Sequence, residues 1–184
     1  MIELRDVVVA YESRVILDSI NLTINDGETL VILGGSGSGK STLLRLLIGL
    51  QRPTSGQIIV DGTDITTLSE DEFNTVRRKM GMVFQYSALF DSMSVGENVA
   101  FGLRQHTDLG DDEIKRIVAE RLDWVGLKGY ESYMPNELSG GMKKRVSLAR
   151  AIALDPSLIL YDEPSSGLDP ITSGTISMLI KGMQ

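Results

Sequence analysis

The sequence predicts an α/β fold with a mixed β-sheet: an antiparallel part near the N-terminus, a core of buried strands and an inserted helical subdomain. Residues 2–24 place apolar side chains at alternate positions in "IELRDVVVAY" and "RVILDSINLTI", as half-buried strands do. The segments "TLVIL" and "LILY" are almost continuously apolar, which is typical of strands buried on both faces. Helical patterns follow both segments, and strands that alternate with helices indicate an α/β architecture.

The first of these apolar segments leads into a glycine-rich turn. Thr29–Leu33 is predicted to be a strand that ends at Gly34, and a helical pattern begins at Lys40. This helix is expected to stop near Gly49, with Pro53 beyond it. A strand, a glycine loop and a helix in this order form the phosphate site of many α/β proteins.

The turn itself, "GGSGSGKS", fits the pattern G-x-x-x-x-G-K-[ST] at Gly34, Gly39, Lys40 and Ser41. Its glycines let the backbone curl so that N–H groups face an anion, and the following helix directs the positive end of its dipole there. Lys40 is expected to reach the β- and γ-phosphates of a nucleotide, and the Ser41 hydroxyl to ligate Mg²⁺. A flexible glycine–serine turn is the alternative, but the flanking strand and helix favour a phosphate loop.

Two more short strands are predicted between turns, "GQIIVDG" at 56–62 and "MGMVFQ" at 80–85. Between them Ser69 and Glu72 form a capping box for a helix that continues to about Lys79.

The segment that follows, at about 87–153, is predicted to be a mostly helical subdomain within a single domain that spans residues 1–184. Ser94 and Glu97 form a second capping box. The stretch "DDEIKRIVAERLDWVGL" is amphipathic, and Gly126 is its expected stop.

Two carboxylates follow the apolar strand "LILY". Asp162 stands at the C-terminal end of the strand, where ligands gather in such sheets, and it can hold Mg²⁺. Glu163 comes next and can accept a proton from an attacking water. An acidic pair in solvent is the alternative, but the phosphate loop upstream favours a site. Beyond it, Asp169–Pro170 predicts the start of a last helix.

A second glycine turn, "LSGG", precedes a helix in which Val146 and Ala149 are spaced for burial, and Ser139 is a suitable N-cap. The simplest interpretation is a capped helix. A second anion-binding helix start is redundant for one nucleotide in one chain. The second helix start has a use if two copies of the chain, related by a twofold axis, bind two ATP molecules between them. Each copy would then offer Lys40 to one ATP and Ser139 to the other. The γ-phosphate would then hold the dimer together, and hydrolysis would loosen it.

The composition excludes several classes of protein. A net charge of −7 argues against a nonspecific nucleic-acid coat, because phosphate neutralisation needs Lys and Arg. The basic runs 77–79 and 143–145 are interpreted as solvated faces. Without cysteine, disulfides and thiolate metal sites are excluded. No apolar run reaches the roughly 20 residues that span a bilayer, so a membrane role is expected to come through a partner protein.

The order of motifs along the chain is a phosphate loop, Gln85, "LSGGM", "LILYDEP" and "SSGLDP". This order resembles the ATP-binding subunit of an ABC transporter over essentially the whole chain. The resemblance implies a P-loop NTPase fold of ABC type, hydrolysis of ATP with Mg²⁺, and a homodimer. ABC-type ATPases of DNA repair carry a long coiled coil before the signature, whereas the segment between Gln85 and Leu138 lacks heptads. No nucleic-acid partner is therefore expected.

By this resemblance Gln85 senses Mg²⁺ and the attacking water, and Asp162 is the magnesium-linked carboxylate. Glu163 is the general base, and Gln85 and Lys40 assist it. The metal would be held by Ser41, Gln85 and Asp162. Tyr11 matches the aromatic residue that stacks on adenine, with an ordinary strand-end tyrosine as the alternative. The residues expected to contact the nucleotide are Tyr11, Gly34, Gly35, Ser36, Gly37, Ser38, Gly39, Lys40, Ser41, Thr42, Ser139, Gly140, Gly141 and Asp169.

Two features depart from the family's pattern. The fifth signature residue is Met142 where glutamine is usual, and ATP-driven closure is expected to survive this change. The family also carries a switch histidine on a core strand after the glutamate, but this sequence ends at Gln184. Its one histidine, His106, lies in the helical region and is expected to be an exposed surface residue. We therefore expect a fragment, with its C-terminal part missing, that binds ATP weakly and turns it over poorly, or a nucleotide-binding module without turnover.

The stretches "FQYSALFDSMSVGENVAFGLRQHTDL", "MPNELSGGM" and "EPSSGLDPITSG" together resemble the ATPases of Mla/Mce-type lipid transporters. That resemblance implies phospholipid traffic between the inner membrane and an outer envelope. It also implies membrane permease subunits, a lipid-binding protein of Mce type, and a peripheral location on the cytoplasmic face of the inner membrane. The permease is expected to dock near Leu89, Phe90 and Met93. An importer of polar amino acids or another small solute is the alternative.

Overall fold

The computed structural model describes residues 1–12 and 14–183, which form two compact units, Met1–Arg77 and Arg78–Met183. Each unit is described by itself. No helix among these described residues is both long and apolar enough to cross a membrane.

The first unit contains an antiparallel sheet in the order β2-β1-β3-β4. Ile2 pairs with Ile24 on one side and with Val60 on the other, so β1 is the inner strand of the sheet. Buried residues alternate along it at Ile2 and Leu4 and again at Val7 and Val9, as the sequence pattern predicts. The strands are β1 (Ile2–Tyr11), β2 (Arg14–Ile24), β3 (Ser55–Val60) and β4 (Thr63–Asp64).

A bulge interrupts β1 between Arg5 and Val8, and it explains one glycine of β3. Gly56 faces this bulge with a φ of +89°, and a Cβ there would come within 2.4 Å of the Asp6 carbonyl oxygen. Only glycine allows the two backbones to approach so closely.

The predicted strand Thr29–Leu33 is wrong. These residues form no strand, and the side chains of Val31 and Leu33 are 70% and 88% exposed. A strand needs a neighbouring strand for its N–H and C=O groups, and the sheet described in the first unit consists of β2, β1, β3 and β4 without this segment. An apolar run indicates that burial is favourable, but it does not specify the partner strand that would provide it.

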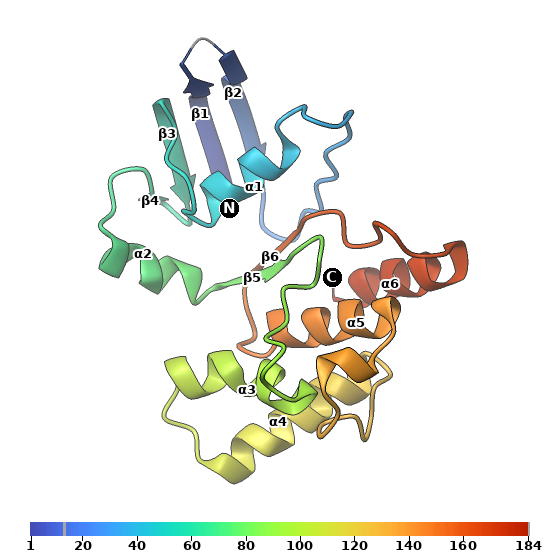
Figure 1. Ribbon diagram of the computed structural model, residues 1–184. Helices are drawn as coiled ribbons and strands as arrows, with labels where there is room; N and C mark the ends of the chain where they lie inside the picture. The colour runs from blue at the N-terminus through green and yellow to red at the C-terminus, as the bar shows by residue number, and fades with distance from the viewer. Residues whose placement is uncertain (13, 184) are drawn as a thin grey trace. The chain divides into compact units, whose positions relative to one another are not determined.

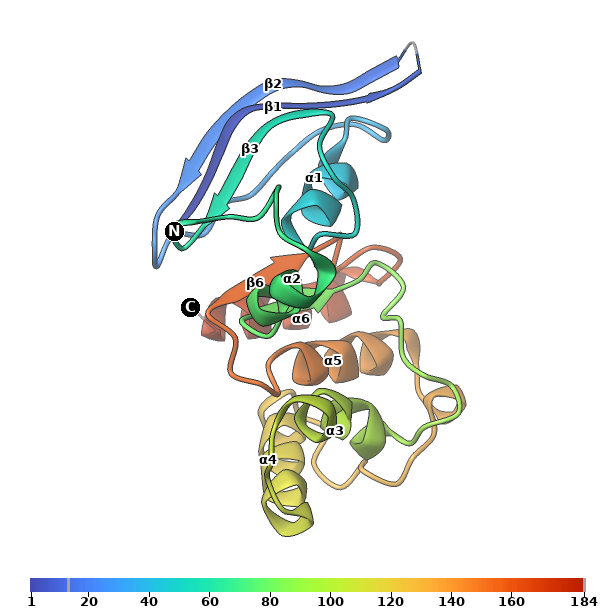
Figure 2. The same cartoon turned by 90° about the vertical axis from the view of Figure 1, so that its left-hand side faces the viewer.

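The helix after the glycine turn, α1 (Lys40–Leu47), buries Leu43, Leu46 and Leu47 and lies beside the sheet of its unit (Figures 1 and 2). It ends before Gly49, which has a φ of +69° and packs on Phe73. The helix stop at a glycine was predicted from the sequence.

Phe73 is the buried residue of α2 (Glu70–Arg77), which begins with the predicted capping box of Ser69 and Glu72. The basic run at 77–79 is not simply a solvated face. Arg77 lies over the Phe73 ring and donates hydrogen bonds to the carbonyl oxygens of Ile48 and Gly49. It therefore binds the C-terminal end of α1.

The second unit contains the parallel pair β5 (Met80–Val83) and β6 (Leu158–Tyr161), both predicted from apolar runs. The pairing continues past the strand end, because the Asp162 N–H donates to the Val83 carbonyl oxygen at 2.9 Å.

The helices of this unit gather around one apolar core (Figure 1), to which Val99, Leu122 and Leu148 contribute fully buried side chains. The capping box of Ser94 and Glu97 is present as predicted. His106, at the end of its helix, is exposed, which confirms that expectation. The helices are α3 (Val95–His106), α4 (Asp111–Trp124), the 3₁₀ helix η1 (Pro135–Glu137), α5 (Gly140–Ala151) and α6 (Pro170–Gly182).

Candidate nucleotide site

The glycine loop of the first unit owes its shape to Gly39. This residue has a φ of +95° and precedes α1 without any side-chain cap. A Cβ at Gly39 would lie 2.8 Å from Leu17 Cδ2 and 3.3 Å from the Ile16 carbonyl oxygen. The loop is therefore seated against β2, and only glycine fits at the point of contact.

The rest of the loop is exposed and curls on itself. Gly37 has a φ of +79°, and a Cβ at Gly34 would meet the Ser38 hydroxyl at 2.6 Å. The ammonium group of Lys40 donates to the carbonyl oxygens of Gly34 and Gly35 at 2.8 and 3.0 Å. Backbone N–H groups, hydroxyls and an ammonium group thus share one short loop, and this donor set suits an anion with several oxygens.

Tyr11, the predicted adenine-stacking residue, ends β1, and its side chain is 54% exposed. An exposed ring at a strand end can stack on a base, but it can equally be an ordinary surface tyrosine.

The carboxylates of the second unit follow β6. Glu163 has a φ of 45°, a left-handed conformation that costs a non-glycine residue about 1–3 kcal/mol. Its Oε2 accepts a hydrogen bond of 3.1 Å from the Gln85 side-chain amide, which also donates to Ser166 Oγ at 3.4 Å. The structure therefore brings together Gln85 and Glu163, which lie far apart in the sequence and were both predicted site residues.

The signature turn lies at the start of α5, where the Ser139 side chain accepts a hydrogen bond of 3.3 Å from the Met142 N–H, as its predicted capping role requires. Gly141 is buried, and a Cβ there would come within 2.5 Å of Thr172 Cγ2. Thr172 is in turn bound by Asp169, which caps α6. The signature turn and the Asp169 loop are therefore packed together within this unit. Met142, which stands where the family's signature usually has glutamine, is partly buried against the apolar core.

Sequence reasoning missed two cationic residues of α5. The run 143–145 was predicted to be a solvated face, but Lys144 is only 5% exposed and donates to the Gln85 carbonyl oxygen. Arg150 donates to the carbonyl oxygens of Ser87 and Ala88 at 2.9 and 2.7 Å. Burial lowers the pKa of both groups, and Asp162 and Glu163 act in the opposite direction on the pKa of Lys144. The sequence did contain one indication of this burial, because both residues lie in a helix whose apolar residues are spaced as in a buried helix.

The donor set proposed for Mg²⁺ includes only one carboxylate. No group of three His, Cys, Asp or Glu side chains that could hold a metal ion occurs in the parts of the chain that the structure describes. Mg²⁺ commonly keeps several waters and binds one or two carboxylates together with substrate phosphates. Ser41, Gln85 and Asp162 therefore fit a magnesium ion that arrives with a nucleotide better than a permanent metal site.

Comparisons with known proteins agree with this geometry. The family model described as "ABC transporter" matches residues 17–166. The chain is 49% identical over 98% of its length to the intermembrane phospholipid transport system ATP-binding protein MlaF of Haemophilus influenzae, of which it covers 69%. It is 50% identical over 97% of its length to the probable ribonucleotide transport ATP-binding protein mkl of Mycobacterium tuberculosis, of which it spans about half, at 50%.

Solved structures agree as well. The dimeric post-hydrolysis structure of the ATP-binding cassette MJ0796, bound to ADP and Pi, matches with a TM-score of 0.92 at 35% identity. That match covers 100% of this chain and 82% of the other. The α/β fold of this type was predicted, and the antiparallel and parallel sheets are both present. From its motifs, its fold and these relatives, the chain belongs to the ABC transporter family.

Proposed function

We propose that this chain is the ATP-binding and ATP-hydrolysing subunit of a membrane transporter whose cargo is phospholipid. The observation that carries the catalytic part is the hydrogen bond between Gln85 and Glu163 at the end of the parallel strand pair β5 and β6. A carboxylate so placed and oriented can act as a general base.

The phosphate loop binds the triphosphate. Its N–H groups and the Lys40 ammonium group neutralise phosphate oxygens, and Lys40 exchanges its contacts with Gly34 and Gly35 for them. Tyr11 stacks on the adenine ring. Ser41, Gln85 and Asp162 would hold Mg²⁺, which would supply positive charge to the transferred phosphoryl group.

Glu163 accepts the proton of the attacking water, and Gln85 orients both the carboxylate and that water. The left-handed backbone of Glu163 fits this role, because strained residues persist where the surrounding structure fixes them for function.

A second copy of the chain completes each site. Ser139, Gly140 and Gly141 contact the nucleotide of the partner copy, and Asp169 lies in the loop that crosses the interface. The dimeric state of the MJ0796 cassette with ADP and Pi supports this proposal. Residues at about 87–153 form the helical subdomain of one ATPase domain.

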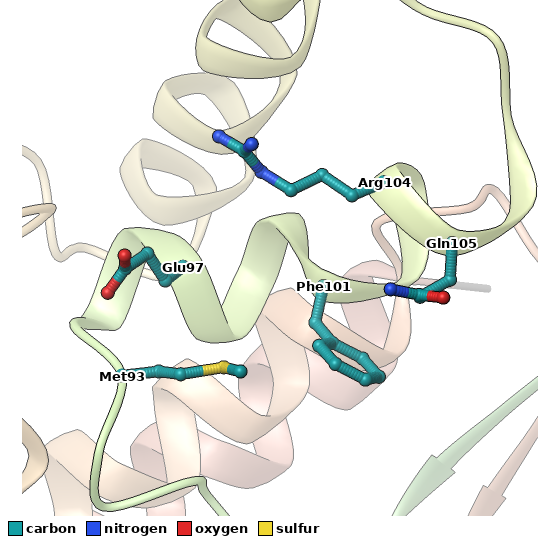
Figure 3. A pocket seen from close by; sticks show the side chains of 5 residues that line it. All are labelled: Met93, Glu97, Phe101, Arg104 and Gln105. Carbon is teal, nitrogen blue, oxygen red and sulfur yellow. The ribbon is translucent and has the colours of Figure 1, made fainter.

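The permease docks on the surface around α3, next to the Gln85 segment. Phe90 is 41% exposed and lies 4.8 Å from the Phe101 ring, measured between ring centroids. Met93 and Phe101 extend on one side of α3 and help to line a pocket of about 250 Å³ (Figure 3). Glu97, Arg104 and Gln105 complete the lining, and a pocket that joins apolar with charged side chains suits a short amphipathic helix of a membrane protein.

The phospholipid cargo rests on the relatives named MlaF, at 49% identity in Haemophilus influenzae. The partners are then a permease and a lipid-binding protein of Mce type, and the chain is peripheral to the cytoplasmic face of the inner membrane. The relatives named mkl, at 50% identity, favour a second candidate, a transporter of a small solute such as the ribonucleotide in their name.

One experiment separates these cargoes. The full-length ATPase is assembled with its permease in liposomes, and ATP turnover is measured with phospholipid-loaded binding protein or with ribonucleotide. We expect stimulation by the lipid-loaded protein alone. Stimulation by ribonucleotide alone would replace the phospholipid proposal with the second candidate.

A further inference from the structure

The segment that begins at Gln85 is held both by backbone hydrogen bonds of its own turn and by side chains of α5. Ser87 and Ala88 have φ values of 63° and 48°, so two successive non-glycine residues adopt a left-handed backbone. Such residues persist only where surrounding contacts fix them. Arg150 adds to the bonds of the turn by donating to the carbonyl oxygens of Ser87 and Ala88.

Lys144 provides the contact nearest to the chemistry. Its ammonium group donates to the carbonyl oxygen of Gln85, while the side-chain amide of the same residue donates to Glu163. The side chain of Lys144 is 5% exposed, although a buried ammonium group is costly unless it is hydrogen-bonded or paired. A surface position on the same helix would avoid that cost, so a specific role for Lys144 is required to explain its burial.

We propose that Lys144 is a positioning residue for ATP hydrolysis: it fixes the backbone of Gln85 so that the Gln85 amide meets Glu163 and the attacking water. This inference rests on the proposed ATPase function and deepens it. Lys144 lies five residues after Ser139 on the same helix. The helix that starts at the signature turn therefore also holds the residue that orients the general base.

The consequence is a defect in turnover rather than in binding. Without the ammonium group the Gln85 backbone shifts, and a misplacement of about 1 Å at a reacting group can cost about 100-fold in rate. Binding of the nucleotide depends on the phosphate loop and should change little.

The test is a double-mutant cycle in the full-length, assembled transporter. Lys144→Met and Lys144→Arg are made in the wild-type and in the Gln85→Ala background, and kcat, the KM for ATP and the dissociation constant for MgATP are measured. We expect Lys144→Met to lower kcat by about 10- to 100-fold, with the dissociation constant nearly unchanged. Lys144→Arg, which keeps the charge and the donors, should restore most of the loss. In the Gln85→Ala background Lys144→Met should have little further effect, because Lys144 acts through the Gln85 side-chain amide, which is already absent there.

The matched control is Lys143→Met, which removes the same charge from the neighbouring, half-buried residue and should leave kcat within about twofold. If Lys144→Met does not fold, Lys144→Gln takes its place in the same cycle. A loss that is equally large with and without the Gln85 side chain would overturn the inference, as would unchanged turnover. Glu163→Gln in the same preparation tests the assignment of the general base separately, because turnover that survives it would refute that assignment. The proposed function has its own test, because a wild-type transporter that does not hydrolyse ATP would overturn it.

Discussion

The two units build their parts of the candidate site in different ways. The phosphate loop of the first unit is made of exposed backbone, and its lysine is bound to the loop's own carbonyl oxygens. The catalytic region of the second unit is a network of side chains: Lys144 holds Gln85, and Gln85 holds Glu163. A backbone loop suits the binding of an anion of fixed shape, whereas a side-chain network can adjust the position of one reacting group.

The two helix starts show the same contrast. Gly39 leaves the start of α1 without a side-chain cap, whereas Ser139 caps α5 through the Met142 N–H. The first start therefore suits the proposed nucleotide, whereas the second is already stabilised by a side-chain cap within its own chain. A ligand at the start of α5 would bind in addition to the Ser139 cap, which agrees with a nucleotide that is held mainly by another copy of the chain.

The largest expected effect is on the side-chain network. Glu163→Gln keeps the shape of the side chain but removes its basicity, so ATP turnover should fall by about 100- to 10,000-fold while MgATP binding persists. Parallel measurements of hydrolysis and of equilibrium binding check this prediction. Unchanged turnover would refute the assignment of the base.

The backbone loop should show the opposite pattern. Lys40→Met removes a charged donor to phosphate, and hydrogen bonds to charged groups contribute about 1.5–3 kcal/mol. We expect MgATP binding to weaken by roughly 10- to 100-fold, as measured by calorimetry. Binding at wild-type affinity would show that the ammonium group does not reach the phosphates.

The glycine at the base of the loop should matter for stability. Gly39→Ala combines a φ of +95° with a contact of 2.8 Å to Leu17, so it should destabilise the protein by about 1–3 kcal/mol. Gly35→Ala is the matched control, because a Cβ at Gly35 would have no atom within 4 Å and this residue has no positive φ. Urea denaturation of both variants checks the difference. If both variants lost the same stability, the positive φ and the close contact of Gly39 would not be the cause of its effect.

At the capped helix start a smaller effect is expected. Ser139→Ala removes the cap of α5 and should cost about 1 kcal/mol, whereas Ser139→Gly should cost a few tenths. Both variants should weaken ATP-driven dimerisation more than binding of ATP by a single copy, which analytical ultracentrifugation can measure. Weakened binding in monomers with normal dimerisation would contradict the two-copy arrangement.

The smallest effect concerns Asp169, the N-cap of α6. Its carboxylate accepts a hydrogen bond from the Thr172 hydroxyl and others from the N–H groups of Ile171 and Thr172, which lower its pKa below the ordinary 3.8. A lowered pKa stabilises the folded state above pH 3.8, and that contribution disappears as the pH falls through the folded-state pKa. Melting curves should show that Asp169→Asn loses stability near pH 7 and that this loss shrinks progressively as the pH falls below 3.8. A loss that does not depend on pH would exclude the charge as its cause.

Local chemistry made much of this structure predictable from the sequence. The capping boxes at Ser69 and Ser94 and the glycine stop at Gly49 depend on residues a few positions apart, so the sequence contains all that they need. The failures depend on distant partners. Thr29–Leu33 is apolar enough for a strand, but pairing is decided elsewhere in the fold.

Lys144 shows the same limit at the site. Three consecutive basic residues resemble a solvated face, and the burial of the middle one becomes visible only when β5 places Gln85 beside α5. The pairing of Gln85 with Glu163 likewise requires β5 and β6 to be neighbours. For these residues the motif order indicated the family, but not the contacts.

The central claim is that each reaction centre uses residues of two copies, and mixed dimers test it most directly. Full-length copies carrying Lys40→Met are mixed with copies carrying Ser139→Glu, which places a carboxylate where a phosphate oxygen of the partner's nucleotide should lie. In a mixed dimer one site carries both defects and the other carries neither, so ATP turnover should rise well above that of either variant alone. Turnover that stays at the sum of the two separate variants, although mixed dimers form, would contradict the account.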